Sequence, residues 1–414
     1  MDRSEFYAEA EANSTGPLQG VRILEATNYG PGPMCGMVLC DYGAESIKID
    51  MPGSGDPIRQ IAPFVPGDDP LENSCWHLTL NRAKKGITLD IRTATGQALF
   101  RELASKVDIV IESFTPGTMA KWHIGYDDLI KVKPDLIYIA ISAFGQFGPL
   151  HTKKGFDPHA QAMGGMMSVT GERDGRPLRC GFAIVDNMCA WQGAMAAMAA
   201  LHYRKQTGRG QFIDASLADV TLYASDVNLM GAPNARYVAK RLGNATLGGV
   251  PINSYLCQDQ RFIFINAAID PHWVRLCKLM GREEMIEDPR FSTMGARSKH
   301  LDLVDAAIGE WAASVPLAEA LRQLDAEGVT AGPIMDFDEI INFPHYLERE
   351  SIAEVEHPRY GALKMNGVAP KFSLTPAHIR GPAPRIGEHN NTVYTAELGL
   401  SAERLQELQK QRVI

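Results

Sequence analysis

The stretch Val21-Arg-Ile-Leu-Glu-Ala26, with the turn Asn28-Tyr-Gly-Pro-Gly-Pro33, the segment Met34–Tyr42 and the apolar run Ser46-Ile-Lys-Ile-Asp50, decides the fold class. Both apolar runs have the length of buried strands. The segment between them is predicted to be a short helix that ends at Gly43. A strand, a helix and a second strand in one short stretch are typical of a βαβ unit, in which the two strands are parallel.

The same alternation continues along the first half of the chain. Strands are predicted over Gly86–Ile91, Val107–Glu112, Leu136–Ile141 and Phe212–Leu217, with a helix over Thr95–Lys106. This pattern predicts an α/β fold, in which a large Rossmann-like domain contains a mostly parallel, doubly wound sheet. Such sheets bind ligands in the crevice beyond the carboxyl ends of their strands.

The pattern changes near Asp226. Tyr255–Ile265 is predicted to form two antiparallel strands about a tight turn, and helical segments follow it. We therefore expect a large domain over residues 1–225, a smaller α+β domain over 226–328, and a C-terminal part over 329–414.

Composition excludes several classes of protein. The net charge of −8 and the pI near 5.8 argue against a nucleic-acid binder. The seven cysteines are odd in number and form no CxxC pair, which favours a reduced, cytoplasmic setting without disulfides or a metal site. No signal peptide is recognisable at the N-terminus, and no apolar run approaches the ~20 residues of a membrane span.

Standard motifs of cofactor and hydrolase chemistry are absent. The sequence contains no GxGxxG, GxxxxGK[ST], HExxH or GxSxG. An NAD-dependent oxidoreductase is therefore a remote alternative, and we expect no tightly bound cofactor.

One carboxylate stands out in the segment Cys180-Gly-Phe-Ala-Ile-Val-Asp-Asn-Met-Cys-Ala-Trp-Gln-Gly193. Asp186 follows an apolar run, interpreted as a strand, and precedes a helix rich in alanine and methionine, expected over Trp191–Arg204. By itself this placement favours a helix N-cap, because an Asp there accepts hydrogen bonds from free backbone N–H groups. The alternative is a carboxylate that is held in a dry pocket for chemistry.

The chain as a whole resembles the class III CoA-transferases, the CaiB/BaiF family of formyl-CoA, carnitine and bile-acid CoA-transferases. The resemblance rests on seven segments that occur in order: Pro17-Leu-Gln-Gly-Val-Arg-Ile-Leu24, Tyr42-Gly-Ala-Glu-Ser-Ile-Lys-Ile49, Asn81-Arg-Ala-Lys-Lys-Gly-Ile-Thr-Leu-Asp90, Asp108-Ile-Val-Ile-Glu-Ser-Phe-Thr-Pro-Gly117, Gly155-Phe-Asp-Pro-His-Ala-Gln161, Thr207-Gly-Arg-Gly-Gln211 and Gly387-Glu-His389.

The resemblance implies a function for Asp186. It stands where the family has the aspartate that attacks an acyl-CoA thioester, giving a mixed anhydride and then an aspartyl-CoA thioester. Such covalent catalysis divides one difficult exchange into easier steps. Succinyl-CoA is a common donor in this family, and a carboxylic acid is the acceptor. The resemblance also implies an interlocked dimer whose large domain includes both ends of the chain, either a homodimer or a heteromer with a related subunit.

The resemblance further implies a set of CoA contacts. Arg92, Lys121 and Lys154 would meet phosphate oxygens, although any one of them taken alone is more simply explained as a solvated surface charge. The complete set of implied contacts is Asn28, Tyr29, Gly30, Leu89, Arg92, Ser113, Phe114, Thr115, Lys121, Trp122 and Lys154.

Departures from the family pattern bear on the substrate. Gly30 stands where formyl-type members carry a glutamine, which leaves room for an acyl group bulkier than formyl or oxalyl. Met51 replaces a basic residue that often follows the second strand. The apolar surroundings predict a bulky aromatic or branched acceptor, such as benzylsuccinate, an aryl-lactate or a carnitine-like acid; the side chains concerned are Phe144, Phe147, Phe156 and Phe182.

Two alternatives come from the same family. The 2-methylacyl-CoA racemases carry a histidine immediately before the Asp of the Gly-x-Asp segment, whereas this chain has Phe156 before Asp157. Without that histidine a racemase lacks one acid/base group. The other alternative is a non-catalytic subunit of a heteromeric transferase, which the presence of Asp186 disfavours. Asp157 is either a carboxylate that positions Lys154 or the acceptor, or a helix cap.

Overall fold

The computed structural model describes residues 2–246 and 248–414, which form two compact units. The first contains Met1–Met166, Arg179–Arg236 and Phe343–Ile414, and the second contains Met167–Leu178 and Tyr237–Asn342. The second unit therefore begins and ends later than the range 226–328 drawn from the sequence, and it also includes a short segment from the first half of the chain.

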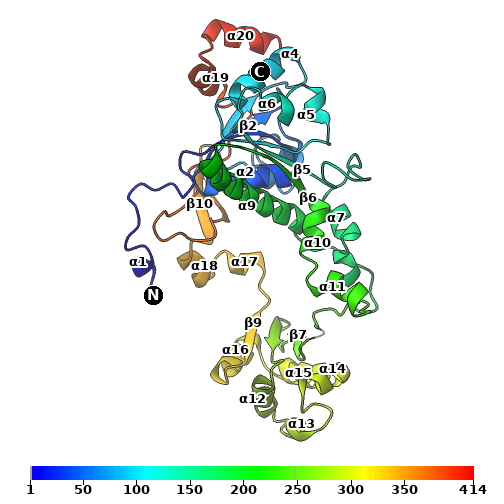
Figure 1. Cartoon of the computed structure of the whole chain (residues 1–414). Coiled ribbons are helices and arrows are strands. Elements are labelled where there is room, and N and C mark those ends of the chain that lie inside the picture. The colour runs from blue at the N-terminus through cyan, green and yellow to red at the C-terminus, as the bar shows by residue number, and fades with distance from the viewer. Residues whose placement is uncertain (1, 247) are drawn as a thin grey trace. The chain divides into compact units, whose positions relative to one another are not determined.

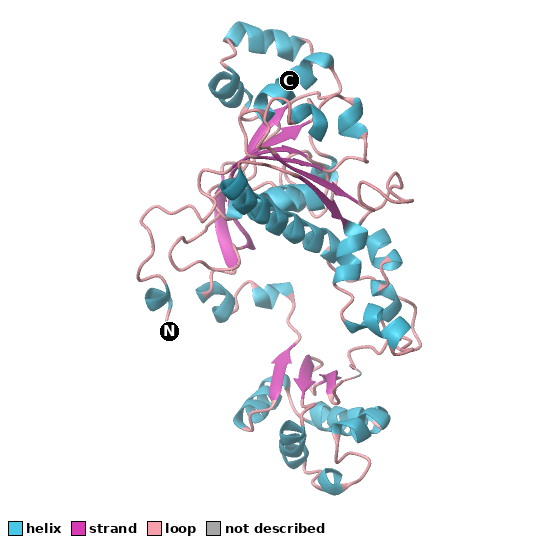
Figure 2. Cartoon of the chain, viewed as in Figure 1, coloured by secondary structure: helices cyan, strands magenta, loops and turns pink. Residues whose placement is uncertain are grey.

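A six-stranded parallel sheet forms the centre of the first unit (Figures 1 and 2). Its order is β3-β2-β1-β4-β5-β6, so the direction of strand addition reverses between β1 and β4. The prediction of an α/β fold with a doubly wound sheet is confirmed. The strands are β1 (Arg22–Ala26), β2 (Glu45–Asp50), β3 (Lys85–Thr88), β4 (Ile109–Glu112), β5 (Ile137–Ser142) and β6 (Phe212–Ser216).

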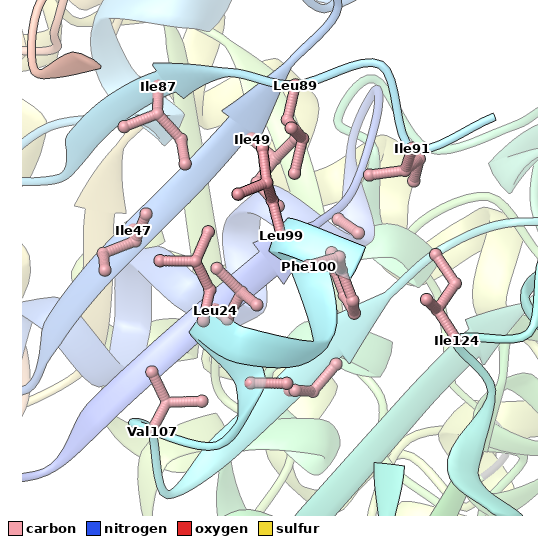
Figure 3. Close-up of a cluster of buried hydrophobic side chains, with 14 of the residues drawn as sticks. Leu24, Ile47, Ile49, Ile87, Leu89, Ile91, Leu99, Phe100, Val107 and Ile124 are labelled. Atoms are coloured by element: carbon pink, nitrogen blue, oxygen red, sulfur yellow. The ribbon is translucent and has the colours of Figure 1, made fainter. Parts of the chain in front are cut away.

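Successive residues of each strand supply opposite faces of this sheet, because side chains alternate along a strand. Leu24 and Val110 face a cluster that includes helix α4 and the C-terminal helices; Figure 3 shows Leu24 beside Leu99 and Phe100 of α4. Ile23 contributes to a second cluster with residues of α2 and α9. Both faces are thus covered by helices, which explains why the strands read as continuous apolar runs.

The helices of the first unit lie along the chain as follows: α1 (Arg3–Phe6), α2 (Pro31–Asp41), η1 (Pro57–Gln60), α3 (Cys75–Leu80), α4 (Ala94–Ala104), α5 (Thr118–Lys121), α6 (Tyr126–Leu129), α7 (Asp157–Met163), α9 (Ile184–Thr207), α10 (Leu217–Tyr223), α11 (Val227–Asn234), α18 (Pro344–Glu348), α19 (Asn390–Leu398) and α20 (Ala402–Lys410). Helix α8 (Met166–Val169) includes the sequence boundary between the units.

Small residues let α9 approach α2 closely. A Cβ on Gly193 would lie 3.1 Å from Sγ of Cys35, and Ala190, Ala194 and Ala197 are buried. Helix α9 begins at Ile184, well before the start expected from the sequence. Because of this earlier start, the carboxylate at 186 belongs to the helix itself.

The C-terminal segment returns to the first unit. Asn390 receives a hydrogen bond from the Thr88 N–H at 2.8 Å and donates one to its hydroxyl at 2.7 Å, and the Tyr394 hydroxyl donates to the Thr88 carbonyl at 2.8 Å. Strands β10 (Ile352–His357) and β11 (Gly361–Asn366) pair antiparallel in this segment.

The second unit is a small α+β fold. The predicted antiparallel pair is confirmed as β7 (Ile252–Leu256) and β8 (Phe262–Asn266), and β9 (Thr330–Pro333) extends it. Trp273 and Leu276 are buried in its core. Its helices are α12 (Asp270–Met280), α13 (Glu284–Glu287), α14 (Met294–Lys299), α15 (Leu301–Ser314), α16 (Leu317–Ala326) and α17 (Phe337–Ile340).

Candidate active site

Asp186 lies in the first turn of α9 as its third helical residue. The N-cap is Ala183, whose side chain makes no capping hydrogen bond. The interpretation of Asp186 as an N-cap is therefore wrong, and so is its placement directly after a strand, because the helix begins at Ile184. The carboxylate of Asp186 accepts no hydrogen bond from the described residues, so it is available for chemistry.

The cap of α9 comes from another helix. Asp157, the first residue of α7, accepts hydrogen bonds through Oδ2 from the N–H groups of Val185 at 2.7 Å and Asp186 at 3.1 Å. Its Oδ1 accepts from Gln161 Nε2 at 2.6 Å, and Gln161 Oε1 accepts from the Cys180 N–H at 2.9 Å. Asp157 and Gln161 are buried. This network fixes the first turn of α9 on its N-terminal side.

The surroundings change the acidity of Asp186. Burial raises the pKa of its carboxyl from 3.8 to about 7, and the neighbouring charge of Asp157 adds to this rise. Both effects disfavour a second negative charge in a poorly solvated place. A more basic carboxylate is a better nucleophile, and a pKa near the working pH leaves a useful fraction ionised.

The turn between β1 and α2 approaches this carboxylate. A Cβ on Gly30 would lie 2.4 Å from Asp186 Oδ2, so a larger residue at position 30 would displace the carboxylate. Tyr29 has a φ of 61°, and its N–H donates to Oδ1 of the buried Asp56 at 3.0 Å. Asp56 also pairs with the buried Lys48 at 3.2 Å. The hydrogen bond from Tyr29 to the ion-paired Asp56 thus fixes the turn, and with it Gly30 beside the Asp186 carboxylate.

The first predicted CoA contacts lie at the reversal point of the sheet. The Asn28 N–H donates to Ser113 Oγ at 2.9 Å, which joins the segments that follow β1 and β4. These strands are neighbours across the point where the strand order reverses. Ligands of doubly wound sheets bind at this point.

Other predicted contacts lie on the segment after β4. The rings of Phe114 and Trp122 meet edge to face with centroids 5.3 Å apart, and Thr115 and Lys121 are exposed. The segment therefore offers an aromatic surface beside a cation, next to Ser113.

The remaining predicted contacts are Arg92, Leu89 and Lys154. The Arg92 guanidinium forms a two-point pair with Asp90, with Nε–Oδ1 and Nη2–Oδ2 distances of 2.8 Å. Leu89 is 1% exposed and packs within the core, so it presents no surface to a ligand. Lys154 is exposed in the loop before α7.

A pocket with a volume of ≈ 640 Å³ contains the Asp186 carboxylate. It brings together six residues singled out from the sequence, Tyr29, Gly30, Phe156, Asp157, Phe182 and Asp186; the Phe156 ring meets Tyr29 edge to face at 5.9 Å. Most of the other walls are apolar, and the complete lining also includes Met34, Met37, Ile58, Ile61, Pro63, Cys75, Trp76, Thr79, Leu80, Pro158, Arg179, Gly181, Ala183, Asn187 and Asn366.

Sequence reasoning missed three residues of this site. Gln161 stands in a quoted family segment without an assigned role, Arg179 directly precedes the segment around Asp186, and Asp56 lies in a loop with no motif. Of these three, only Arg179 could have been found from the sequence, because it is a single charge at the border of a largely apolar run.

Residues 2–246 and 248–414 contain neither a candidate metal site nor a candidate membrane span. They contain no group of three or more His, Cys, Asp or Glu side chains placed to hold a metal ion. Over the same ranges, no helix combines the length and the apolar character needed to cross a membrane.

Comparisons with known proteins identify the family of this chain. The family described as CoA-transferase family III matches residues 18–390. Succinyl-CoA–D-citramalate CoA-transferase of Chloroflexus aurantiacus is 37% identical over 96% of this chain and 98% of its own. The succinyl-CoA–L-malate CoA-transferase beta subunit of the same organism is 32% identical over 97% and 99%.

A solved structure extends the comparison to the fold. A CaiB/BaiF family protein from Brucella suis superposes with a TM-score of 0.84 at 30% identity, covering 92% of this chain and all of its own. The family match, the relatives over nearly the whole chain and this structural neighbour lead to one conclusion: the chain belongs to CoA-transferase family III.

Proposed function

We propose that this chain transfers coenzyme A from an acyl-CoA donor to a carboxylic acid acceptor, with Asp186 as the covalent nucleophile. The observation that carries the proposal is the Asp186 carboxylate in a largely apolar pocket, where it accepts no hydrogen bond from the described residues and has a pKa raised to about 7. This carboxylate sits against the turn that begins at the sheet's reversal point, beside the expected CoA contacts.

The first half-reaction makes and breaks bonds at Asp186. An Oδ atom attacks the thioester carbonyl carbon, the C–S bond breaks, and CoA leaves as a thiolate. The thiolate then attacks Cγ of Asp186 and releases the donor acid as a carboxylate, which leaves an aspartyl-CoA thioester. The acceptor carboxylate repeats these steps in reverse and regenerates Asp186. No ATP is needed, because one thioester is exchanged for another.

The chain's own residues support these steps. The apolar lining limits access of water to the anhydride. Asp157 and Gln161 hold the first turn of α9 so that Asp186 keeps its position through both half-reactions. The segments at Asn28, Ser113–Thr115 and Lys121–Trp122 are proposed to bind CoA, and its phosphates to reach Arg92, Lys121 and Lys154.

For the substrates we propose succinyl-CoA as donor and a dicarboxylic acid with an apolar branch as acceptor. The two Chloroflexus relatives are named for succinyl-CoA and for citramalate or malate, which are dicarboxylic acids. Of the four phenylalanines that suggested a bulky acceptor, Phe156 and Phe182 line the pocket, whereas Phe147 is 81% exposed and lies outside its lining. Benzylsuccinate and citramalate satisfy both requirements.

The assembly is proposed to be a dimer of interlocked chains in the cytoplasm. A heteromer stays an alternative, because the malate relative is named as a beta subunit. Co-purification of a related subunit from the native organism distinguishes it from a homodimer.

The test is a hydroxylamine trap followed by peptide mass spectrometry, with succinyl-CoA and a panel of other acyl-CoAs. We expect a hydroxamate on the peptide that contains Asp186. Asp186→Asn should abolish both the label and CoA transfer. Asp219→Asn, which changes an exposed acid in the first turn of α10, is the matched control and should keep both.

Absence of the label with every donor would overturn the covalent mechanism. Exchange of the α-proton in deuterated water, without transfer, would support the racemase alternative instead.

A further inference from the structure

The pocket that contains Asp186 has a single cationic side chain among the described residues that line it, Arg179. This side chain is exposed. Its Nη1 donates to the Cys180 carbonyl at 3.1 Å, and no acidic group of the described residues pairs with it. Several guanidinium donors are therefore free to bind a ligand in the pocket.

Arg179 is also connected to the nucleophile through the backbone. The peptide N–H between Arg179 and Cys180 donates to the buried Gln161, Gln161 donates to Asp157, and Asp157 accepts the N–H of Asp186. This chain of hydrogen bonds holds the base of the arginine and the base of the nucleophile in one frame. An anchored cation in such a frame suits recognition of a group at a set distance from the reacting carbon.

We infer that Arg179 is the specificity-determining residue that binds the distal carboxylate of the acyl group and of the acceptor. The inference rests on the proposed transferase function. When Asp186 attacks the thioester carbonyl, the far end of a dicarboxylic acyl chain lies in the same pocket, beside two acidic residues. Its negative charge is repelled there unless a cation compensates it. A guanidinium does so with two parallel hydrogen bonds, which a carboxylate accepts.

The distinguishing experiment compares two donors that differ only at the far end. Succinyl-CoA and butyryl-CoA carry acyl chains of the same length, with a carboxylate or a methyl group at the end. For Arg179→Gln we expect kcat/KM with succinyl-CoA to fall by about 30-fold or more, and that with butyryl-CoA to change by less than about threefold. Arg179→Lys should recover part of the loss. Arg176→Gln, at an exposed arginine outside the pocket lining, is the matched control.

Calorimetric binding of free succinate and butyrate to the full-length wild type and to Arg179→Gln gives a second readout that needs no turnover. Selective loss of succinate binding supports the inference even if no transfer is detected, in which case only the proposed function fails. The role of Arg179 would be overturned if kcat/KM fell equally for both donors and binding fell equally for both acids, or if neither quantity fell. In that case an active wild-type enzyme would still support the transferase function.

Discussion

A Cβ placed on Gly30 would lie 2.4 Å from Oδ2 of Asp186, closer than any unstrained contact between such atoms. The two residues come from opposite halves of the first unit's chain, one from the β1–α2 turn and one from the start of α9. The turn therefore limits where the carboxylate can lie, while Asp157 holds the backbone N–H of Asp186.

Gly30→Ala tests this contact. Gly30 has a φ of −91°, which alanine adopts without strain, so the protein should fold with nearly unchanged thermal stability. The new methyl group should turn the Asp186 carboxylate away from its attack position. We expect kcat/KM to fall by about 10- to 100-fold, measured as initial rates of CoA transfer. Unchanged rates in Gly30→Ala would show that the carboxylate moves freely.

The cap of α9 is tested by exchanging donors and acceptors. In Asp157→Asn one amide N–H must face a donor, either a backbone N–H of α9 or Gln161 Nε2. We expect a loss of about 1–3 kcal/mol in the free energy of unfolding by denaturant. The double change Asp157→Asn with Gln161→Glu restores every donor–acceptor pair, because the introduced glutamate accepts from the introduced amide and from the Cys180 N–H. It should recover much of the loss; equal stability of the single and double variants would contradict the network.

The raised pKa of Asp186 predicts a pH dependence of the rate. The nucleophile must be ionised, so kcat/KM should rise with pH and reach its midpoint near the pKa of about 7. The charge of Asp157 contributes to the rise in this pKa, so Asp157→Asn should move the midpoint to lower pH. A midpoint below about pH 5 in the wild type would indicate that the carboxylate is solvated in the free enzyme.

The same shift predicts a cost in stability. The pKa of Asp186 is higher in the folded protein than its ordinary value of 3.8, so the folded state holds a proton that the unfolded state has lost between these values. Stability from this group therefore decreases as pH rises from about 4 to about 7. Asp186→Asn should be more stable than the wild type at pH 8, by about 1–3 kcal/mol, with a smaller advantage at pH 5. Thermal unfolding at both values measures this, with Asp219→Asn as control.

The buried ion pair between Lys84 and Glu25 gives a separate prediction for stability. Lys84 Nζ lies 2.9 Å from Glu25 Oε2, and both side chains are buried. Lys84→Met leaves the Glu25 charge without its partner and should cost about 3–5 kcal/mol. Changing both, Lys84→Met with Glu25→Gln, should cost less than the single change. Denaturant unfolding distinguishes these outcomes, and a double variant less stable than Lys84→Met would contradict the pairing.

The predictions from sequence succeeded where one local pattern decides the structure. Buried strands such as β1 and β4 are continuous apolar runs bounded by turns, and their alternation with helices is sufficient for a parallel sheet. The resemblance to the CoA-transferases likewise rested on segments readable in order, and the family match confirms it. Asn81–Asp90 is one of these family segments, although the sequence did not indicate that its Lys84 is buried against Glu25.

The sequence by itself therefore determined the sheet, the family and the identity of Asp186 as the residue to examine. Only the tertiary structure decided that Asp186 is not a cap, because the cap is supplied by Asp157 from a different helix. It also decided that Gly30 meets Asp186 and that Arg179 shares their pocket. Such contacts join residues far apart in the chain. They depend on the strand order and on where α9 packs, and no local periodicity of the sequence specifies either.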